Sequence, residues 1–183
     1  MNGDVIEHPA YIVLNLPSPM AEVIRDLRAK YDFARSAMPA EITITGSCGT
    51  GLVEPGQEVA RIAEEMDAVA RDLVPFTVNF TKVGRFPGTN IYFLELNDDN
   101  PFEQVRQRLE RSRIRFLPSP YPFHAHCTLK LRCEPSDPEL LEMFFMDVPK
   151  TPFTLSMMSL YSLPDPAECE LLHATTFSGN VQD

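Results

Sequence analysis

Hydrophobic and polar positions follow two different periods along the chain. Residues 11–16 form an almost continuous apolar run, which is typical of a buried strand, whereas residues 41–45 alternate between polar and apolar types as a half-buried strand does. Residues 21–33 instead carry apolar side chains at helical spacing. Applied to the whole chain, these patterns predict strands at 11–16, 41–45, 76–83, 91–96, 123–132, 153–163 and 169–177, and helices at 21–33, 56–73, 102–114 and 138–145.

Segments of the two halves of the chain match each other. Residues 75–78 (Pro-Phe-Thr-Val) correspond to residues 152–155 (Pro-Phe-Thr-Leu), and with a second offset residues 41–44 correspond to residues 126–129. The order strand, helix, strand, strand is therefore repeated. We find no linker between the halves, so we expect one domain over 1–183 that is built around 41–97 and 123–178.

The composition argues against duplex-nucleic-acid-binding, membrane-spanning and secreted classes of protein. The chain has 183 residues with 26 acidic and 16 basic side chains, and its net charge of −10 argues against long duplex nucleic acid as a partner. No apolar run reaches the ~20 residues of a membrane helix, and the N-terminus lacks a signal-peptide pattern. The four cysteines show no metal-binding spacing. We expect a cytoplasmic, monomeric protein without membrane contact.

Positive charge is concentrated in one stretch. Residues 101–133 carry seven basic and two acidic side chains, whereas acidic residues dominate the rest of the chain. This stretch could attract a small anion, or it could be the solvated face of the helix at 102–114.

Polar side chains with catalytic potential share one face of the strand at 123–132. Because side chains alternate along a strand, Cys127 and Leu129 point to the core, and the opposite face carries His124, His126, Thr128, Lys130 and Arg132. Two imidazoles, a hydroxyl and two cations are costly to bury without partners but suit a cleft that binds an anion.

The matching strand of the first half has a similar polar row. Ile42 and Ile44 take the core side, so Glu41, Thr43 and Thr45 are expected on the exposed side. The repeat thus predicts two polar rows of similar kind.

The unit His126-Cys-Thr-Leu129, with Phe123 before it and a matching strand in the first half, resembles the His-x-Thr/Ser-hydrophobic signature of the 2H phosphoesterase superfamily, also called 2′-5′ RNA ligase-like. The resemblance covers roughly residues 10–178. It implies an α+β fold of two pseudo-symmetric lobes, each an antiparallel sheet with helices on the outside, and a central cleft at which the two motifs face each other.

The resemblance also implies a chemistry. In this superfamily the histidines act as general acid and base on cyclic or 2′-linked phosphodiesters, the Thr/Ser hydroxyls hold the phosphate, and no metal or other cofactor is required. His126 would then be one acid or base, with Thr128 and Thr43 as the phosphate clamps. The chain departs from the pattern at Glu41, which stands where the first histidine belongs.

Three functions remain open. The first is a metal-independent phosphodiesterase, working by hydrolysis or ligation on a 2′,3′-cyclic or 2′-5′-linked nucleotide or RNA end, with Glu41 as the partner of His126. A carboxylate can activate water, but at ~5 Å and an effective dielectric of ~20 it repels a phosphate charge by roughly 3 kcal/mol. The second is a degenerate 2H-fold protein that binds a nucleotide or another small ligand without turnover. The third uses Cys48 as a nucleophile.

Two further residues are candidates for substrate binding. His124 lies two positions before His126, so it could replace the missing partner or lie at the rim of the site. Tyr121 follows Pro120 and could stack on a base, or it could pack within the loop.

Overall fold

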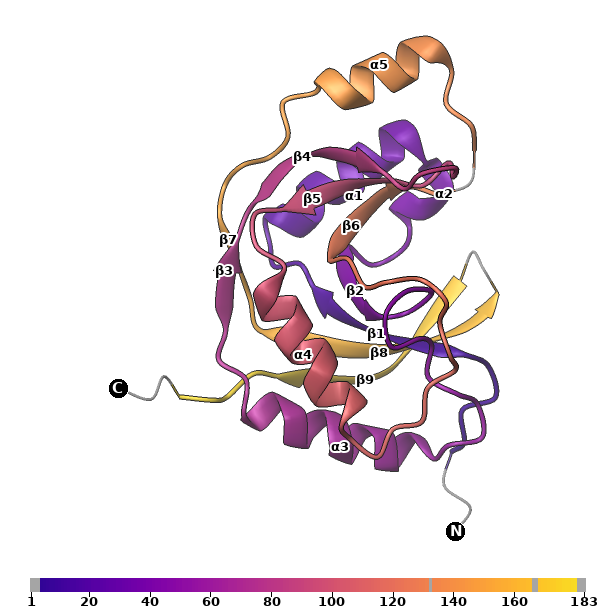
Figure 1. Ribbon diagram of the computed structural model, residues 1–183, viewed down its shortest axis with the longest axis vertical. Helices are drawn as coiled ribbons and strands as arrows, with labels where there is room; N and C mark the ends of the chain where they lie inside the picture. Colours follow the sequence, from indigo (N-terminus) through magenta and orange to yellow (C-terminus); the bar gives the residue numbers. More distant parts are fainter. Residues whose placement is uncertain (1–3, 132, 166–167, 181–183) are drawn as a thin grey trace.

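Three antiparallel sheets form the framework of the protein in the computed structural model, which describes residues 4–131, 133–165 and 168–180 (Figure 1). The four-stranded sheet has the order β2 (Glu41–Thr45), β1 (Ala10–Asn15), β8 (Met157–Asp165), β9 (Glu168–Thr176). The three-stranded sheet has the order β4 (Phe80–Arg85), β5 (Tyr92–Leu96), β6 (His126–Lys130). The third sheet pairs β3 (Phe76–Val78) with β7 (Phe153–Leu155). The fold is therefore of the mixed α+β class.

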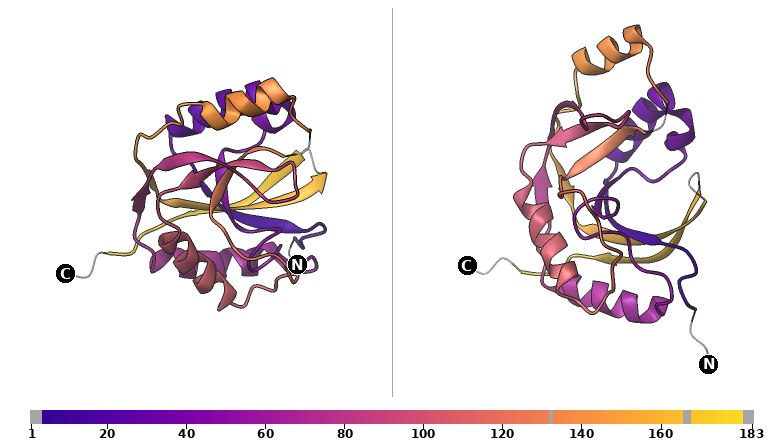
Figure 2. Two further views of the ribbon diagram at one scale, coloured as in Figure 1. Left: turned by 45° about the horizontal axis from the view of Figure 1, so that its top comes forward. Right: turned by 45° about the vertical axis from the view of Figure 1, so that its right-hand side comes forward.

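Helices surround these sheets. The chain forms α1 (Met20–Tyr31), α2 (Phe33–Ser36), α3 (Val59–Arg71), α4 (Asn100–Glu110) and α5 (Asp137–Phe145). Helix α3 packs against β9 and α4, whereas α1 packs against β6 and α5 against β4. Figure 2 shows α3 and α4 together at one end of the molecule and α5 at the opposite end.

The expected elements are present, but two of the expected strands are each divided. The strand at 76–83 is interrupted at Asn79, and the strand at 153–163 is interrupted at Ser156. At each interruption the chain leaves the small β3–β7 sheet and enters a larger sheet. In the strand expected at 123–132, the ladder begins only at His126.

The segments that match in sequence pair with each other in the small sheet. Thr77 of β3 lies opposite Thr154 of β7, and their side-chain oxygens are 2.8 Å apart. The pairing brings together two segments that are 77 residues apart.

The other matching pair of strands, β2 and β6, lies at the edges of the two larger sheets, and the two strands contact each other. An edge strand leaves backbone groups without ladder partners. Here α1 and the residue after it supply partners: Arg28 Nε donates to the Thr128 carbonyl at 2.9 Å, and the Leu131 N–H donates to Asp32 Oδ2 at 3.0 Å. The edge of β6 is thereby fixed to α1.

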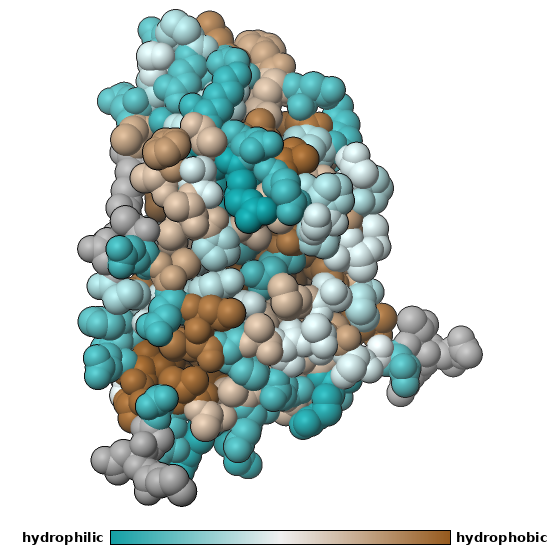
Figure 3. Space-filling model, turned by 180° about the vertical axis from the view of Figure 1, so that it is seen from behind, coloured by the Kyte–Doolittle hydropathy of each residue, from teal (hydrophilic) through white to brown (hydrophobic). Residues whose placement is uncertain are grey.

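Most buried apolar side chains form one core, and a smaller cluster lies beneath α5 around Tyr92 and Leu129. Figure 3 shows that hydrophilic residues cover much of the face opposite that of Figure 1, with a group of hydrophobic side chains beside the N-terminal residues. Among the described residues no helix is long and apolar enough to span a membrane.

The basic stretch is largely neutralised by acidic neighbours. Its arginines form ion pairs on and around α4, namely Arg106 with Glu103 and Glu110, Arg108 with Asp72, Arg113 with Glu65, and Arg115 with Glu54. These contacts agree with a solvated helix face more than with a site for an anion.

Gly51 allows the loop after β2 to lie against the segment before β6. Its φ is +102°, and an added Cβ would overlap the carbonyl oxygen of Leu117.

We therefore expect Gly51→Ala to lower the free energy of unfolding by about 3 kcal/mol or more, measured by urea denaturation. Gly56→Ala is the matched control, since Gly56 also has a positive φ (+83°) but no atom within 4 Å of the added Cβ, so that only about 1 kcal/mol of backbone strain is expected. Equal losses in the two variants would contradict this interpretation.

Candidate active site

The imidazole of His126 is oriented by its own strand. Its Nδ1 lies 2.7 Å from the carbonyl oxygen of His124. A carbonyl only accepts hydrogen bonds, so Nδ1 carries the proton and Nε2 of the neutral ring has a free lone pair. His126 is thus arranged to accept a proton at Nε2.

Apolar surroundings keep this ring uncharged. His126 is 9% exposed, and its ring is contacted edge-on by Phe86 and Phe93 at centroid distances of 4.9 and 5.1 Å. Burial lowers the pKa of His126 to about 4, although the His124 carbonyl and the charge of Glu41 act in the opposite direction. At neutral pH the ring is therefore a base.

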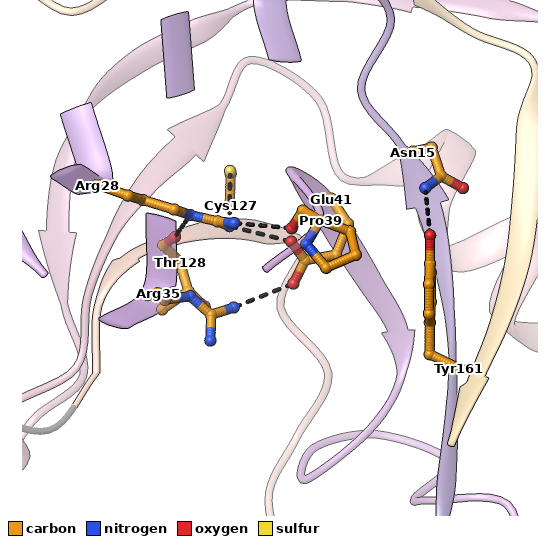
Figure 4. A network of polar contacts seen from close by, with 8 residues as sticks. All are labelled: Asn15, Arg28, Arg35, Pro39, Glu41, Cys127, Thr128 and Tyr161. Carbon is orange, nitrogen blue, oxygen red and sulfur yellow. Dashed lines mark hydrogen bonds and ion pairs between the residues drawn. The ribbon is translucent and has the colours of Figure 1, made fainter. Parts of the chain in front are cut away.

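Glu41 differs from its expected exposed position. Its side chain is 3% exposed, and each carboxylate oxygen accepts a hydrogen bond from one guanidinium at 3.0 Å, Oε2 from Arg28 and Oε1 from Arg35 (Figure 4). Thr45 of the same row is also buried, and its hydroxyl accepts the N–H of Ile12. Of this row, only Thr43 is partly exposed.

Arg28 joins three parts of the chain around Glu41. This fully buried side chain donates to the Thr128 carbonyl on β6, to the Pro39 carbonyl at 2.7 Å, and to Glu41 on β2 (Figure 4). Sequence reasoning missed Arg28, although a signal existed. It occupies the position between Ile24 and the end of α1 on the buried stripe of that helix, where a charged residue requires a buried partner.

Arg35 has unused hydrogen-bonding capacity beside this ion pair. Its side chain is 15% exposed and donates to Glu41, but among the described residues its buried Nε has no partner. The charge of Arg35 also lowers the pKa of His126, so the two side chains lie within electrostatic range of each other. No sequence pattern indicated Arg35, because the short helix α2 was not expected.

The remaining candidates, Thr43, Thr128, His124 and Tyr121, differ in exposure and in their contacts. Thr128 is 8% exposed and follows His126 on β6, which contacts the strand of Thr43. His124 precedes β6, and its Nδ1 is hydrogen-bonded to Oδ2 of Asp99 at 3.0 Å. Tyr121 is 65% exposed, so its ring is accessible.

The side chain of Lys130 links β6 to α1 and α5. Its side chain is 6% exposed, and its Nζ donates to the Tyr31 carbonyl at 2.6 Å and to Glu139 at 3.1 Å. This cation of the polar row is therefore directed toward α1 and α5. Arg132, the other cation expected in the row, lies outside the described residues.

The geometry disfavours Cys48 as a nucleophile. Burial raises the pKa of its thiol, which reduces the fraction of reactive thiolate. Among the residues that the structure describes, no group of three His, Cys, Asp or Glu side chains could hold a metal ion.

A sequence model described as the 2′-5′ RNA ligase superfamily matches residues 16–166. The chain belongs to this superfamily. A comparison with curated proteins gave no match. The resemblance of the chain to the superfamily is thereby confirmed at the level of the family.

Solved structures agree with the fold of the superfamily. LigT of E. coli complexed with 3′-AMP is 16% identical, with a TM-score of 0.62 over 96% of this chain and 99% of that chain. The protein TT0787 of Thermus thermophilus is also 16% identical, with a TM-score of 0.64 over 93% and 98%. LigT complexed with NADP+ is 14% identical, with a TM-score of 0.62 over 96% and 99%. At these identities the similarity establishes a LigT-like fold.

We expect Glu41→Gln to lower the free energy of unfolding by about 3–5 kcal/mol, because it removes the charge that compensates the fully buried Arg28. Glu22→Gln is the control, since it breaks an ion pair with Arg25 whose two side chains are about half exposed, and should change stability by about 0.5 kcal/mol or less. Urea denaturation measures both. Similar losses in the two variants would show that the Arg28–Glu41 pair is dispensable.

The lowered pKa of His126 predicts a loss of stability in mild acid. The unfolded chain protonates this ring near pH 6.5 and the folded protein near pH 4, so between these values protons favour the unfolded state. From about pH 7 to about pH 4.5 we expect a loss of about 2 kcal/mol from this group. His126→Asn keeps a donor for the His124 carbonyl but does not titrate. Between about pH 7 and about pH 4.5 the free energy of unfolding of this variant should therefore fall by about 2 kcal/mol less than that of the wild-type protein. Parallel pH profiles of the two proteins would contradict the assignment.

Proposed function

We propose that this protein is a metal-independent phosphodiesterase, acting by hydrolysis or ligation on a 2′,3′-cyclic or 2′-5′-linked nucleotide or RNA end. The observation that carries this proposal is the state of His126, whose neutral ring has its Nδ1 satisfied and its Nε2 free. This imidazole belongs to the segment that resembles the motif of the superfamily, within the matched residues 16–166.

The site lies between the two larger sheets, and the motif strands β2 and β6 border a common cleft. Each of these sheets combines strands of 41–97 with strands of 123–178. Two observations support this arrangement. The matching segments of β3 and β7 pair with each other, and β2 contacts β6 although the two strands belong to different sheets.

Each residue of the site has a role in this proposal. The hydroxyls of Thr43 and Thr128 donate to non-bridging phosphate oxygens, and the guanidinium of Arg35, whose side chain is 15% exposed, adds positive charge. Nε2 of His126 accepts the proton of the attacking water or hydroxyl. Glu41 acts through its partner by fixing the guanidinium of Arg35.

The ion pairs also offset the repulsion between the Glu41 carboxylate and an anionic substrate. Arg28 and Arg35 together outweigh the single charge of Glu41, which leaves the group with a net positive charge. A phosphate group is then attracted, and the accessible ring of Tyr121 is available to stack on a base. The complexes of E. coli LigT with 3′-AMP and NADP+ support a nucleotide as the ligand.

One observation favours the alternative of binding without turnover. Both carboxylate oxygens of Glu41 already accept hydrogen bonds from guanidinium groups, so this residue is a poor replacement for a histidine that moves a proton.

The test is an assay of the purified protein with 2′,3′-cyclic nucleotides and 2′-5′ dinucleotides in the presence of a chelator. We expect turnover that His126→Ala lowers by about 100-fold or more, because a positioned acid or base contributes at least that factor. His173→Ala is the control, since His173 lies on β9 and pairs with Asp67 of α3, away from this site. Saturable nucleotide binding without turnover would overturn the enzymatic proposal in favour of the alternative, as would activity that appears only in Glu41→His.

A further inference from the structure

A second imidazole lies beside His126. The rings of His124 and His126 are nearly parallel, with an interplanar angle of 11° and centroids 6.2 Å apart. Phe86 and Phe93 each contact both rings edge-on or nearly so. The two imidazoles are therefore held as one pair by the same apolar support.

The two rings are oriented in the same manner. Nδ1 of His126 donates a hydrogen bond to a carbonyl. Nδ1 of His124 lies 3.0 Å from Oδ2 of Asp99, a carboxylate oxygen that accepts a hydrogen bond from it. Among the described residues neither Nε2 has a hydrogen-bond partner. Because His124 is 36% exposed and His126 is 9% exposed, the pair has one accessible and one buried member.

The side chain of Asp99 orients His124 and does not cap the helix that begins beside it. Asp99 is the N-cap residue of α4, a position at which an aspartate side chain commonly accepts a hydrogen bond from a backbone N–H. Its side chain makes no such bond and instead contacts His124, 25 residues away. A carboxylate that fixes an imidazole through Nδ1 is a recurrent device for directing Nε2 at a substrate.

We propose that His124, positioned by Asp99, is the second proton-transferring group of the site, in place of a histidine at position 41. This inference rests on the proposed function. Because the ring planes are nearly parallel and the centroids are 6.2 Å apart, one phosphodiester at the edges of the two rings can bridge both imidazoles. Glu41, whose oxygens are held by Arg28 and Arg35, then has a positioning role.

In the proposed hydrolysis of a 2′,3′-cyclic phosphodiester, His126 acts as the base and protonated His124 acts as the acid. Nε2 of His126 takes a proton from water as the water oxygen bonds to phosphorus. The bond from phosphorus to one ribose oxygen breaks, and that oxygen receives the Nε2 proton of protonated His124, which gives a phosphomonoester. His126 then releases its proton and His124 regains one, so the net reaction consumes one water molecule.

Several charged or titratable groups surround the pair. Asp99 of α4 contacts His124, and Glu41 and Arg35 act on the charge of His126. Glu95 of β5 lies opposite His126 and is paired with Lys82 of β4, and the backbone of His124 lowers the pKa of the Cys48 thiol, which burial raises.

The experiment compares His124→Gln and Asp99→Asn with the wild-type protein in steady-state assays across pH. We expect His124→Gln to lower kcat by about 100-fold with little change in KM, and to change the shape of the pH profile, because one of the two proton-transferring groups is absent. Asp99→Asn should lower kcat by about tenfold. A merely structural role would scale the whole profile without changing its shape.

His173→Gln is the matched control, because His173 also pairs with an aspartate, at 2.8 Å, but lies on β9. It should leave kcat and the profile unchanged. If His126→Ala abolishes turnover while His124→Gln keeps the wild-type profile, the role of His124 is overturned and the proposed function stands. If the wild-type protein shows no turnover, both are overturned. Thermal unfolding of each variant distinguishes a change in kcat from a loss of folded protein. Asp99→Asn tests the same histidine pair by a second substitution.

Discussion

The buried contact between Arg28 and Glu41 is the interaction on which the site depends. A guanidinium with no exposed surface is tolerated only where its N–H groups are satisfied, and Arg28 finds acceptors on β2, on β6 and in the Pro39 segment. These acceptors come from strands of two different sheets. The cost of burying the charge thus fixes the position of β6 relative to β2, and with it the spacing of the motif residues.

The site combines opposite electrostatic environments a short distance apart. Around His126 the aromatic rings exclude water and keep the imidazole neutral. Around Glu41 two arginines reverse the sign of the local charge, so that a residue that repels phosphate becomes part of a positively charged group. A general base requires the first environment and an anionic substrate requires the second, which explains why both occur together in a proposed phosphodiesterase.

Predictability from sequence varied with the range of the interactions involved. The alternating pattern of 123–132 located β6, and the helical stripe of 21–33 located α1, because both patterns depend on local geometry. All five residues of β6 are buried, so the alternation did not predict their exposure. The interruptions at Asn79 and Ser156 were not visible, since they arise where strands change partners between sheets. Glu41 was placed at the correct position of its strand but in the wrong environment, since its partners come from helices 6 and 13 residues away.

The sequence by itself determined the family, the class of fold and the motif of His126, because hydrophobic periodicity and a short signature are local properties of the chain. Only the tertiary structure decided the charge state and the partners of the site residues. Burial sets the pKa of His126, and Asp99 reaches His124 across 25 residues. Desolvation and ion pairing depend on what the folded chain places around a group, and the neighbouring residues in sequence do not reveal it.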